Sequence, residues 1–252
     1  MAERITSRSN PLIKQLRTLA ASGSERRKAG QYLCDSPKLM TDALRAGAPV
    51  RTVVYTEQVT LPELPKEIRC VSVSEDVMEA VSPMKTPQGV LFLCDLPAAE
   101  LPGALNGRHY VVLDGVQDPG NVGTVLRTAD AFGADGLFLL PGCADPYSPK
   151  TVRASMGAVF RCPVWQCTAQ QLSQLLRHSD MPLYGAALRD DTADVRTVNY
   201  ERAAVAIGSE GRGLSAEVLE LCDATVRIPM EPRCESLNAA VAAAVLLWEM
   251  YR

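Results

Sequence analysis

No uninterrupted apolar run in this sequence is long enough to cross a membrane. The longest apolar stretch, Leu237 to Trp248, is interrupted by Asn238 and has alanine as its commonest residue, whereas a transmembrane helix needs roughly 20 predominantly apolar residues. The first ten residues contain arginines but lack the apolar segment of a secretory signal. We therefore expect a cytoplasmic protein that has no membrane partner.

Histidine is scarce, and the cysteines lack the spacing of a metal site. The two histidines, His109 and His178, are distant from any cysteine pair, and the closest cysteines, Cys162 and Cys167, are separated by four residues. We expect all eight cysteines to be reduced thiols and no metal to be bound. So few histidines also argue against a reaction that uses imidazole as its general base.

Charge is distributed unevenly along the 252 residues. The net charge is −3, with 47% hydrophobic and 22% charged residues, which is typical of a globular protein with one large or two ordinary domains. Residues 1–30 contain seven basic and two acidic side chains, and the remainder contains 19 basic and 27 acidic ones. A basic segment on an acidic body suits contact with phosphate groups, and a solvated helix face explains it equally well.

A segment rich in proline, glycine and alanine divides the chain. Residues 96–107, LPAAELPGALNG, have neither helical nor strand periodicity and indicate a linker at 97–106. Residues 1–96 therefore form the first expected domain, a small α/β unit. Its predicted helices are Asn10–Leu19, one that ends at Ala46, and Glu75–Val81, and its predicted strands are Thr52–Thr56, Cys70–Val73 and Val90–Cys94.

Beyond the linker, residues 107–252 alternate between apolar strands and helices. Such alternation predicts an α/β domain whose parallel sheet is covered by helices on both faces. The predicted strands are Tyr110–Leu113, Gly136–Leu140, Pro182–Ala187, Ala204–Ile207 and Thr225–Ile228, and the predicted helices are Asn121–Phe132, Ser148–Gly157, Ala169–His178, Ser215–Leu221 and Leu237–Tyr251. Ligands of such sheets bind at the carboxyl ends of the strands, so the loops that follow the strands should carry the chemistry.

The loop after the first of these strands runs from Asp114 to Asn121, DGVQDPGN, and opens a helix. We predict Asn121 as the N-cap of that helix. Arg127 lies on the same helix face as Gly123 and Asp130. A helical glycine costs about 1 kcal/mol relative to alanine, which a ligand or partner close to Arg127 would offset. An ion pair with Asp130 is the alternative role for Arg127.

Two later loops combine glycines with amide and hydroxyl side chains. Residues 208–215, GSEGRGLS, contain three glycines that let a ligand approach the backbone, but they match neither GxGxxG nor GxxxxGK[ST]. Residues 229–238, PMEPRCESLN, lead into an alanine-rich helix with Ser236 as its predicted N-cap. Asn238 is a poor helix former with both a donor and an acceptor, which favours a functional role. The alanines at 239, 240, 242, 243 and 244 predict tight packing, in the core or at a dimer interface.

Taken in order, NxGxxxRTAxAFG, IGSEGRGLS and RIPM…ESLNAAVAAAVLLWE resemble the three motifs of the TrmH (SpoU) branch of the SPOUT methyltransferases, over about residues 107–252. ITSRSNPLIKQLRTL and MKTPQGVL resemble the small substrate-binding domain that many members carry, although Asp35-Ser36 stands where a Glu-Gly pair is common. The resemblance implies a C-terminal trefoil-knot α/β domain that transfers a methyl group from S-adenosylmethionine to a ribose 2′-hydroxyl of RNA.

The resemblance also implies the roles of individual residues. It gives Arg127 the central catalytic role, with Asn121, Glu210, Ser236 and Asn238 around it. Main-chain atoms would hold S-adenosylmethionine at Ala187, Leu188, Gly208, Ile228, Met230 and Leu237. The basic segment would contact RNA through Arg8, Lys14, Arg17, Arg26 and Arg27, and the enzyme would be a homodimer packed through the knot. Because a guanidinium stays protonated at neutral pH, we expect Arg127 to hold a phosphate and to stabilise the developing alkoxide rather than to act as a base.

Three alternatives stay open at this point. Ribosomal RNA is the expected substrate by analogy with members that have the extra N-terminal domain, and transfer RNA is the first alternative. A non-catalytic RNA-binding protein that kept the knot is the second, although it would not need all five polar site residues. A nucleotide-dependent oxidoreductase is the third, but the sequence lacks a phosphate-binding fingerprint after the first strand.

Overall fold

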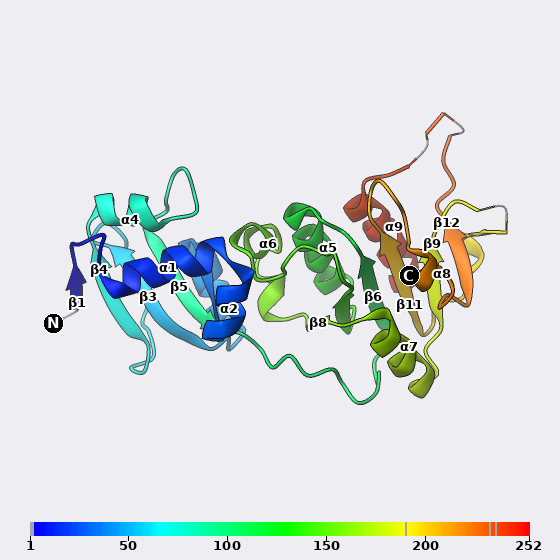
Figure 1. The fold of residues 1–252 in the computed structure, drawn as a ribbon, viewed down its shortest axis with the longest axis horizontal. Coiled ribbons are helices and arrows are strands. Elements are labelled where there is room, and N and C mark those ends of the chain that lie inside the picture. The colour runs from blue at the N-terminus through cyan, green and yellow to red at the C-terminus, as the bar shows by residue number, and fades with distance from the viewer. Residues whose placement is uncertain (1–2, 190, 232, 235) are drawn as a thin grey trace. The chain divides into compact units, whose positions relative to one another are not determined.

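The computed structural model describes residues 3–189, 191–231, 233–234 and 236–252 (Figure 1). The chain forms two compact units. The first contains Met1–Ala98 together with Tyr147–Phe160, and the second contains Ala99–Pro146 and Arg161–Arg252. Residues 147–160 belong to the second domain predicted from the sequence, whereas in the structure they pack with the first unit.

The first unit is built on a mixed five-stranded sheet with the order β1-β4-β3-β5-β2. Strands β1 (Glu3–Ile5), β4 (Arg69–Val73) and β3 (Val50–Thr56) are parallel, and β5 (Val90–Asp95) runs antiparallel to both β3 and β2 (Gln31–Asp35). Helices α1 (Pro11–Ala21) and α4 (Glu75–Val81) bury their apolar stripes in one core with β3, β4 and β5. Helices α2 (Gly23–Ala29) and α3 (Pro37–Arg45) flank β2 on either side in the sequence.

Residues 147–160 attach to β2 of the first unit. They contain α6 (Pro149–Ala154), from which Arg153 Nη1 contacts Asp35 Oδ2 at 2.5 Å. The rings of Tyr147 and Tyr32 are also in contact, with centroids 4.9 Å apart. Burial raises the pKa of Asp35, and the nearby Arg153 guanidinium opposes that shift. The ion pair therefore ties a segment from the middle of the chain to the sheet of the first unit.

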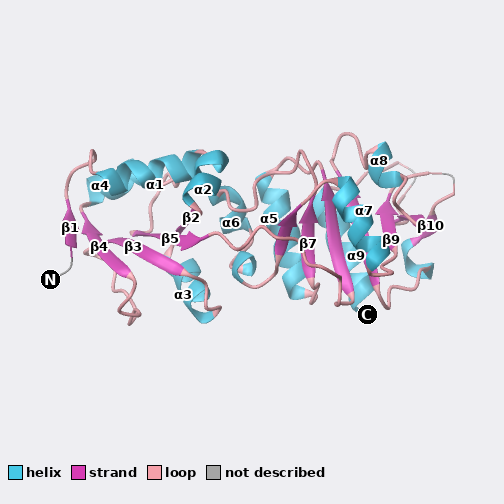
Figure 2. Ribbon diagram, turned by 60° about the horizontal axis from the view of Figure 1, so that its bottom comes forward, coloured by secondary structure: helices cyan, strands magenta, loops and turns pink. Residues whose placement is uncertain are grey.

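The second unit contains a seven-stranded sheet with the order β10-β12-β9-β11-β6-β7-β8. Every registered pair in it is parallel, so the predicted parallel sheet is confirmed. Figure 2 shows its arrows pointing toward one edge. The strands are β6 (His109–Asp114), β7 (Gly136–Leu139), β8 (Val164–Gln166), β9 (Leu183–Ala186), β10 (Ala193–Asp194), β11 (Ala203–Gly208) and β12 (Ala224–Arg227).

Helices cover both faces of this sheet. On one face, α7 (Ala169–His178) and α8 (Ala216–Leu219) share a core with alternate residues of β6, β7, β9 and β11. On the other, α9 (Ala239–Tyr251) packs against β11 and against α5 (Pro119–Ala131). Neighbouring residues of the central strands, such as Val111 and Val112, are both fully buried, which explains why these strands are apolar without alternation. Within the described part of the chain, no helix is long and apolar enough to cross a membrane.

Candidate active site

Three loops meet at the carboxyl edge of the second unit's sheet. They follow β6, β11 and β12, the strands for which sequence analysis expected the chemistry. Side-chain hydrogen bonds connect all three loops, although their residues are separated by up to 117 positions in the sequence. The fold therefore assembles one site from distant segments, as expected at the carboxyl edge of a parallel sheet.

The prediction of Asn121 as a helix N-cap is wrong. Helix α5 begins two residues earlier, and its N-cap is Asp118, whose Oδ1 accepts from the backbone N–H groups of Gly120 at 2.6 Å and Asn121 at 3.0 Å. Aspartate caps a helix as well as asparagine does, and Pro119 is suited to the first helical position. The Asn121 side chain is consequently available for contacts outside its own helix.

The prediction of Ser236 as a helix N-cap is also wrong. Helix α9 is capped by Asn238, whose Oδ1 accepts from Ala240 N at 2.9 Å and from Val241 N at 3.3 Å. Capping uses only the oxygen of the amide. The nitrogen remains free to donate elsewhere, while Ser236 lies exposed on the loop before the helix.

The two asparagines and Glu210 form a hydrogen-bonded chain across the three loops. Asn121 Nδ2 donates to Glu210 Oε1, and Asn238 Nδ2 donates to Asn121 Oδ1 at 3.1 Å. An ionised carboxylate only accepts, so the Glu210 contact fixes which end of the Asn121 amide faces it, and this orientation leaves the Asn121 oxygen for Asn238. The structure thus brings together three of the five predicted catalytic residues.

Arg127 lies on the exposed surface of α5 and takes no part in these hydrogen bonds between the loops. Its predicted alternative, an ion pair with Asp130, is wrong because Arg161 holds the Asp130 carboxylate at 2.6 Å. In the described part of the chain, no hydrogen bond or ion pair involves the Arg127 side chain. An unpaired, permanently charged guanidinium is available for an anion. The catalytic role of Arg127 stays a prediction.

A cavity of about 280 Å³ lies beside the hydrogen-bonded chain, and Glu210 contributes to both. All six residues predicted to bind the cofactor line this cavity: Ala187, Leu188, Gly208, Ile228, Met230 and Leu237. Ser236 lines it as well. Its apolar part is formed by side chains such as Ala186, Ile207 and Leu246, and the remainder comes from the loops. The structure therefore gathers the predicted cofactor residues in one place.

Gly208 must be glycine for the second loop to close. A Cβ atom built on it would lie 2.0 Å from the backbone carbon of Gly213 and 2.1 Å from its oxygen. The loop folds back through two backbone hydrogen bonds between Ser209 and Gly213, at 3.1 and 2.9 Å. This hairpin carries Glu210, so the close approach of Gly208 and Gly213 helps to set where that carboxylate lies.

The basic segment of the first unit requires one correction. Arg26 was predicted to contact RNA, but it is only 4% exposed and its Nη1 donates to Leu19 O at 2.5 Å. A guanidinium buried against backbone carbonyls at the end of α1 serves the fold. The other predicted residues, Arg8, Lys14, Arg17 and Arg27, are exposed. For these four, RNA contact stays a prediction.

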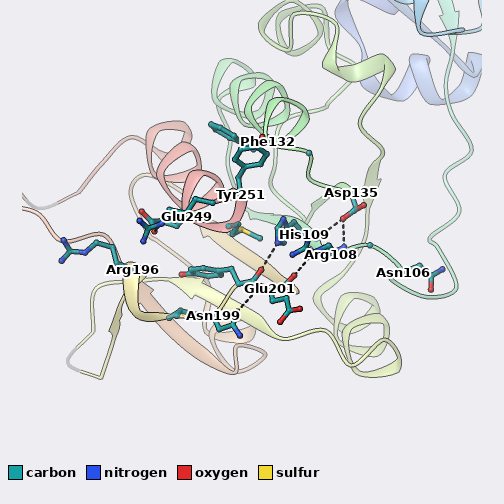
Figure 3. A pocket seen from close by; sticks show the side chains of 16 residues that line it. Asn106, Arg108, His109, Phe132, Asp135, Arg196, Asn199, Glu201, Glu249 and Tyr251 are labelled. Carbon is teal, nitrogen blue, oxygen red and sulfur yellow. Dashed lines mark hydrogen bonds and ion pairs between the residues drawn. The ribbon is translucent and has the colours of Figure 1, made fainter.

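A larger hollow, of about 810 Å³, lies at the opposite edge of the same sheet (Figure 3). Its lining includes the residues that precede β6 and β11, and Phe132 and Tyr251 lie together at its rim with ring centroids 5.6 Å apart. Several polar groups there already bind one another: Asp135 Oδ2 accepts from the backbone N–H of Arg108 at 2.7 Å. Because parallel sheets bind ligands at their carboxyl edge, the smaller cavity is the better candidate.

No group of three or more histidine, cysteine, aspartate or glutamate side chains in the described residues is arranged to hold a metal ion. The eight cysteines are all free thiols. Burial raises the pKa of several of them, to about 12 for Cys162 and about 11 for Cys167. Thiols with such pKa values are poor nucleophiles at neutral pH, so Cys162 and Cys167 are not candidate nucleophiles.

Comparison with known proteins connects this geometry to a family. Residues 108–248 match the profile of the SpoU rRNA Methylase family, and residues 10–91 match that of the MRM3-like substrate binding domain. A 23S rRNA (guanosine(2553)-2′-O)-methyltransferase of Bacillus subtilis is 33% identical over 98% of this chain and 99% of its own length. A 23S rRNA (uridine(2479)-2′-O)-methyltransferase of Streptomyces viridochromogenes is 32% identical over 100% of this chain and 92% of its own.

Solved structures of related proteins superpose on this chain over nearly its whole length. The AdoMet-bound rRNA methyltransferase of Sinorhizobium meliloti superposes with a TM-score of 0.88 and 31% identity, covering 99% of this chain and 97% of that one. The SpoU methyltransferase AviRb of Streptomyces viridochromogenes, in complex with AdoMet, gives a TM-score of 0.83 and 30% identity over 96% and 97% of the two chains. With profile, relatives and structures in agreement, this chain belongs to the SpoU rRNA methylase family and has its SPOUT fold, preceded by a substrate-binding domain.

Proposed function

We propose that this protein transfers a methyl group from S-adenosylmethionine to a ribose 2′-hydroxyl of ribosomal RNA. The observation that carries the proposal is the hydrogen-bonded chain of Glu210, Asn121 and Asn238 beside the 280 Å³ cavity. The three hydrogen-bonded side chains supply oriented polar groups, and the cavity supplies a place for the methyl donor. Both lie at the carboxyl edge of the sheet, where parallel sheets bind ligands.

The cavity suits S-adenosylmethionine. Its volume is close to the lower end of the roughly 300–1,000 Å³ of ligand pockets. Apolar side chains such as Ala186 and Ile207 fit the faces of a purine ring, and backbone groups around Gly208 can bind its polar edge. Leu188 lines the cavity and is 62% exposed, and a bound molecule would cover part of it. When bound, S-adenosylmethionine supplies an electrophilic methyl group on a sulfonium.

The protein's own residues would chiefly align the ribose hydroxyl. Alignment of two reactants can supply about 7–11 kcal/mol of the barrier reduction. Glu210 holds the Asn121 amide in one orientation, and the capping bonds hold Asn238. These two amides, with the exposed Ser236 hydroxyl, offer donors and acceptors to a ribose.

Arg127 would act as a cation. Its guanidinium is exposed and has no partner in the described part of the chain, so it can bind a phosphate beside the reacting ribose. The same charge would stabilise the alkoxide that develops as the hydroxyl loses its proton. A guanidinium pKa above about 12 makes it unsuited to accept that proton.

Ribosomal RNA is favoured over transfer RNA as the substrate. The family profile is named for rRNA methylation, and both ribosomal relatives named above align along nearly the whole chain, including its substrate-binding domain. These two relatives are named for different nucleotides, so we propose the substrate class and not a position. Ribosomal RNA is an intracellular molecule, and we therefore retain the predicted cytoplasmic location.

A homodimer is also part of the proposal. The last helix exposes Val241 by 49%, Trp248 by 50% and Tyr251 by 61%. Trp248 and Tyr251 cluster with Phe132 of α5, with ring centroids 5.6–5.7 Å from the Phe132 ring. Exposed aromatic groups of this kind are typical of interfaces. Trp248→Glu should convert a dimer to a monomer in sedimentation equilibrium, and an unchanged mass would contradict this surface.

Methyl transfer tests the proposal. Labelled S-adenosylmethionine is incubated with ribosomal and transfer RNA from cells that lack the gene, using the wild type, Arg127→Ala and Arg177→Ala. Arg177 is an exposed arginine on α7, far in the sequence from the site loops, and serves as the matched control. We expect label in ribosomal RNA with the wild type and the control only. Cofactor binding by calorimetry without transfer to any RNA would instead support the non-catalytic alternative.

A further inference from the structure

Asp114 makes a contact that holds two of the site loops together. It is the last residue of β6, half-buried, and its Oδ2 accepts from the backbone N–H of Ser215 at 2.7 Å, across 101 positions of sequence. Ser215 is the N-cap of α8 and uses its own hydroxyl to accept from Val218 N. The hydroxyl of Ser215, and not the carboxylate of Asp114, therefore caps the helix.

The hydrogen bond between Asp114 and Ser215 lies next to the hairpin that Ser209 and Gly213 close and that carries Glu210. One leg of the hairpin continues directly from β11, where Gly208 pairs in register with Asp114. The other leg ends at Ser215, which the carboxylate holds. Both legs are thus fastened to the same residue at the end of β6, and Glu210 lies between the two attachment points.

We propose that Asp114 is a positioning residue for methyl transfer. By holding Ser215, it keeps the hairpin where Glu210 can accept the hydrogen bond from Asn121 Nδ2. Without that acceptor, the Asn121 amide can rotate, and its bond with Asn238 loses its fixed donor and acceptor assignment. Asp114 does not line the 280 Å³ cavity, so it would act through other residues. The inference rests on the proposed function, because alignment of the ribose is what it would affect.

Asp223 offers a matched control on the same sheet. Its Oδ2 accepts from the backbone N–H of Leu183 at 2.8 Å, a contact of the same type as that of Asp114 and 0.1 Å longer. It lies before β12, at the amino edge of the sheet, away from the three site loops. Asp223→Ala should therefore lose a similar bond without changing methyl transfer.

The test compares Asp114→Ala, Asp114→Asn and Asp223→Ala in the full-length protein. We expect Asp114→Ala to lower kcat by about tenfold to a hundredfold, the effect of a displacement near 1 Å, with the KM for RNA unchanged. Asp114→Asn should retain most activity because its side-chain oxygen still accepts from Ser215 N. Hydrogen exchange of residues 209–216 should become faster in Asp114→Ala and stay unchanged in Asp223→Ala.

If Asp114→Ala does not fold, Ser215→Pro serves as a second variant. Ser215→Pro removes the same donor, together with the hydroxyl that accepts from Val218 N, and the φ of −66° at Ser215 suits proline. It should lower kcat as Asp114→Ala does.

Wild-type kcat in a folded Asp114→Ala or Ser215→Pro, or equal losses in Asp114→Ala and Asp114→Asn, would overturn the positioning role. A wild-type protein that transfers no methyl group would refute the proposed function instead. Unchanged hydrogen exchange in Asp114→Ala would overturn the fastening of the hairpin whatever the activity.

Discussion

Replacing Gly208 with alanine would add a methyl group where the two arms of the Ser209–Gly213 hairpin approach each other. The new Cβ would lie 2.0 Å from Gly213 C, and ordinary contact begins at 3.4 Å, so the two segments must separate by about 1.4 Å. Overpacking of this kind costs about 1–3 kcal/mol. The same displacement moves the hairpin that carries Glu210, and misplacement by about 1 Å near a reacting centre can lower the rate by about a hundredfold.

Gly211 is the control for this prediction, because a Cβ atom there would have no neighbour within 4 Å. We expect Gly208→Ala to lower the midpoint of thermal unfolding by roughly 2–4 °C per kcal/mol, and Gly211→Ala to leave it unchanged. Gly208→Ala should also lower kcat and weaken binding of S-adenosylmethionine in calorimetry. Equal stability and equal cofactor affinity in Gly208→Ala and the wild type would contradict a role for this close approach in shaping the site.

Three further predictions follow from single residues. Ser36 has a φ of 88° and caps α3. Ser36→Gly should remove about 1–3 kcal/mol of backbone strain and lose only a few tenths of a kcal/mol of capping energy. The urea midpoint of unfolding should therefore rise, and a fall would contradict the strain. Arg127→Lys keeps the charge but loses the planar fork, and should lower kcat about a hundredfold at every pH of a pH–rate profile; near wild-type rates would exclude a role for the fork. Burial raises the pKa of Asp35 above its ordinary value, with Arg153 opposing the shift. The folded protein therefore binds the carboxyl proton of Asp35 more tightly than the unfolded chain does. Its stability should therefore fall as pH rises from the unfolded pKa through the folded one, and this fall should be absent in Asp35→Asn during urea titrations at several pH values.

The architecture of the second unit could be predicted because its strands are continuous apolar runs between helices of clear periodicity. Helices Glu75–Val81 and Ala169–His178 were predicted to the residue. Strand β2 and helix α2 were not predicted. Pairing with β5, about 60 residues away, makes Gln31–Asp35 a strand. Gly23–Ala29 contains no large apolar side chain, so it has no apolar stripe to reveal a helix.

The site was predictable in composition but not in its connections. Motif resemblance identified Asn121, Glu210 and Asn238, and the structure brings them together. The sequence offers two candidate N-caps for α5, Asp118 and Asn121, and aspartate and asparagine have similar N-cap propensities. The contact of Asp114 with Ser215 spans the sheet edge and has no local sequence signal.

Arg26 shows the limit of charge patterns. The sequence places it among basic residues that suit RNA, but the fold turns its guanidinium toward carbonyl groups at the end of α1. Only tertiary structure distinguishes it from Arg27, which follows it and is exposed. The substrate-binding role of the first unit therefore rests on the remaining exposed residues and on the matched domain profile.

The central claim is that the methyl group goes to a ribose 2′-hydroxyl, and the location of the label tests it most directly. Ribosomal RNA methylated by the wild type is digested to nucleosides and separated by mass spectrometry, beside RNA treated with Arg127→Ala. We predict that the label occurs in a 2′-O-methylnucleoside with the wild type and is absent with Arg127→Ala. Label on a base, or equal label with both proteins, would contradict the account.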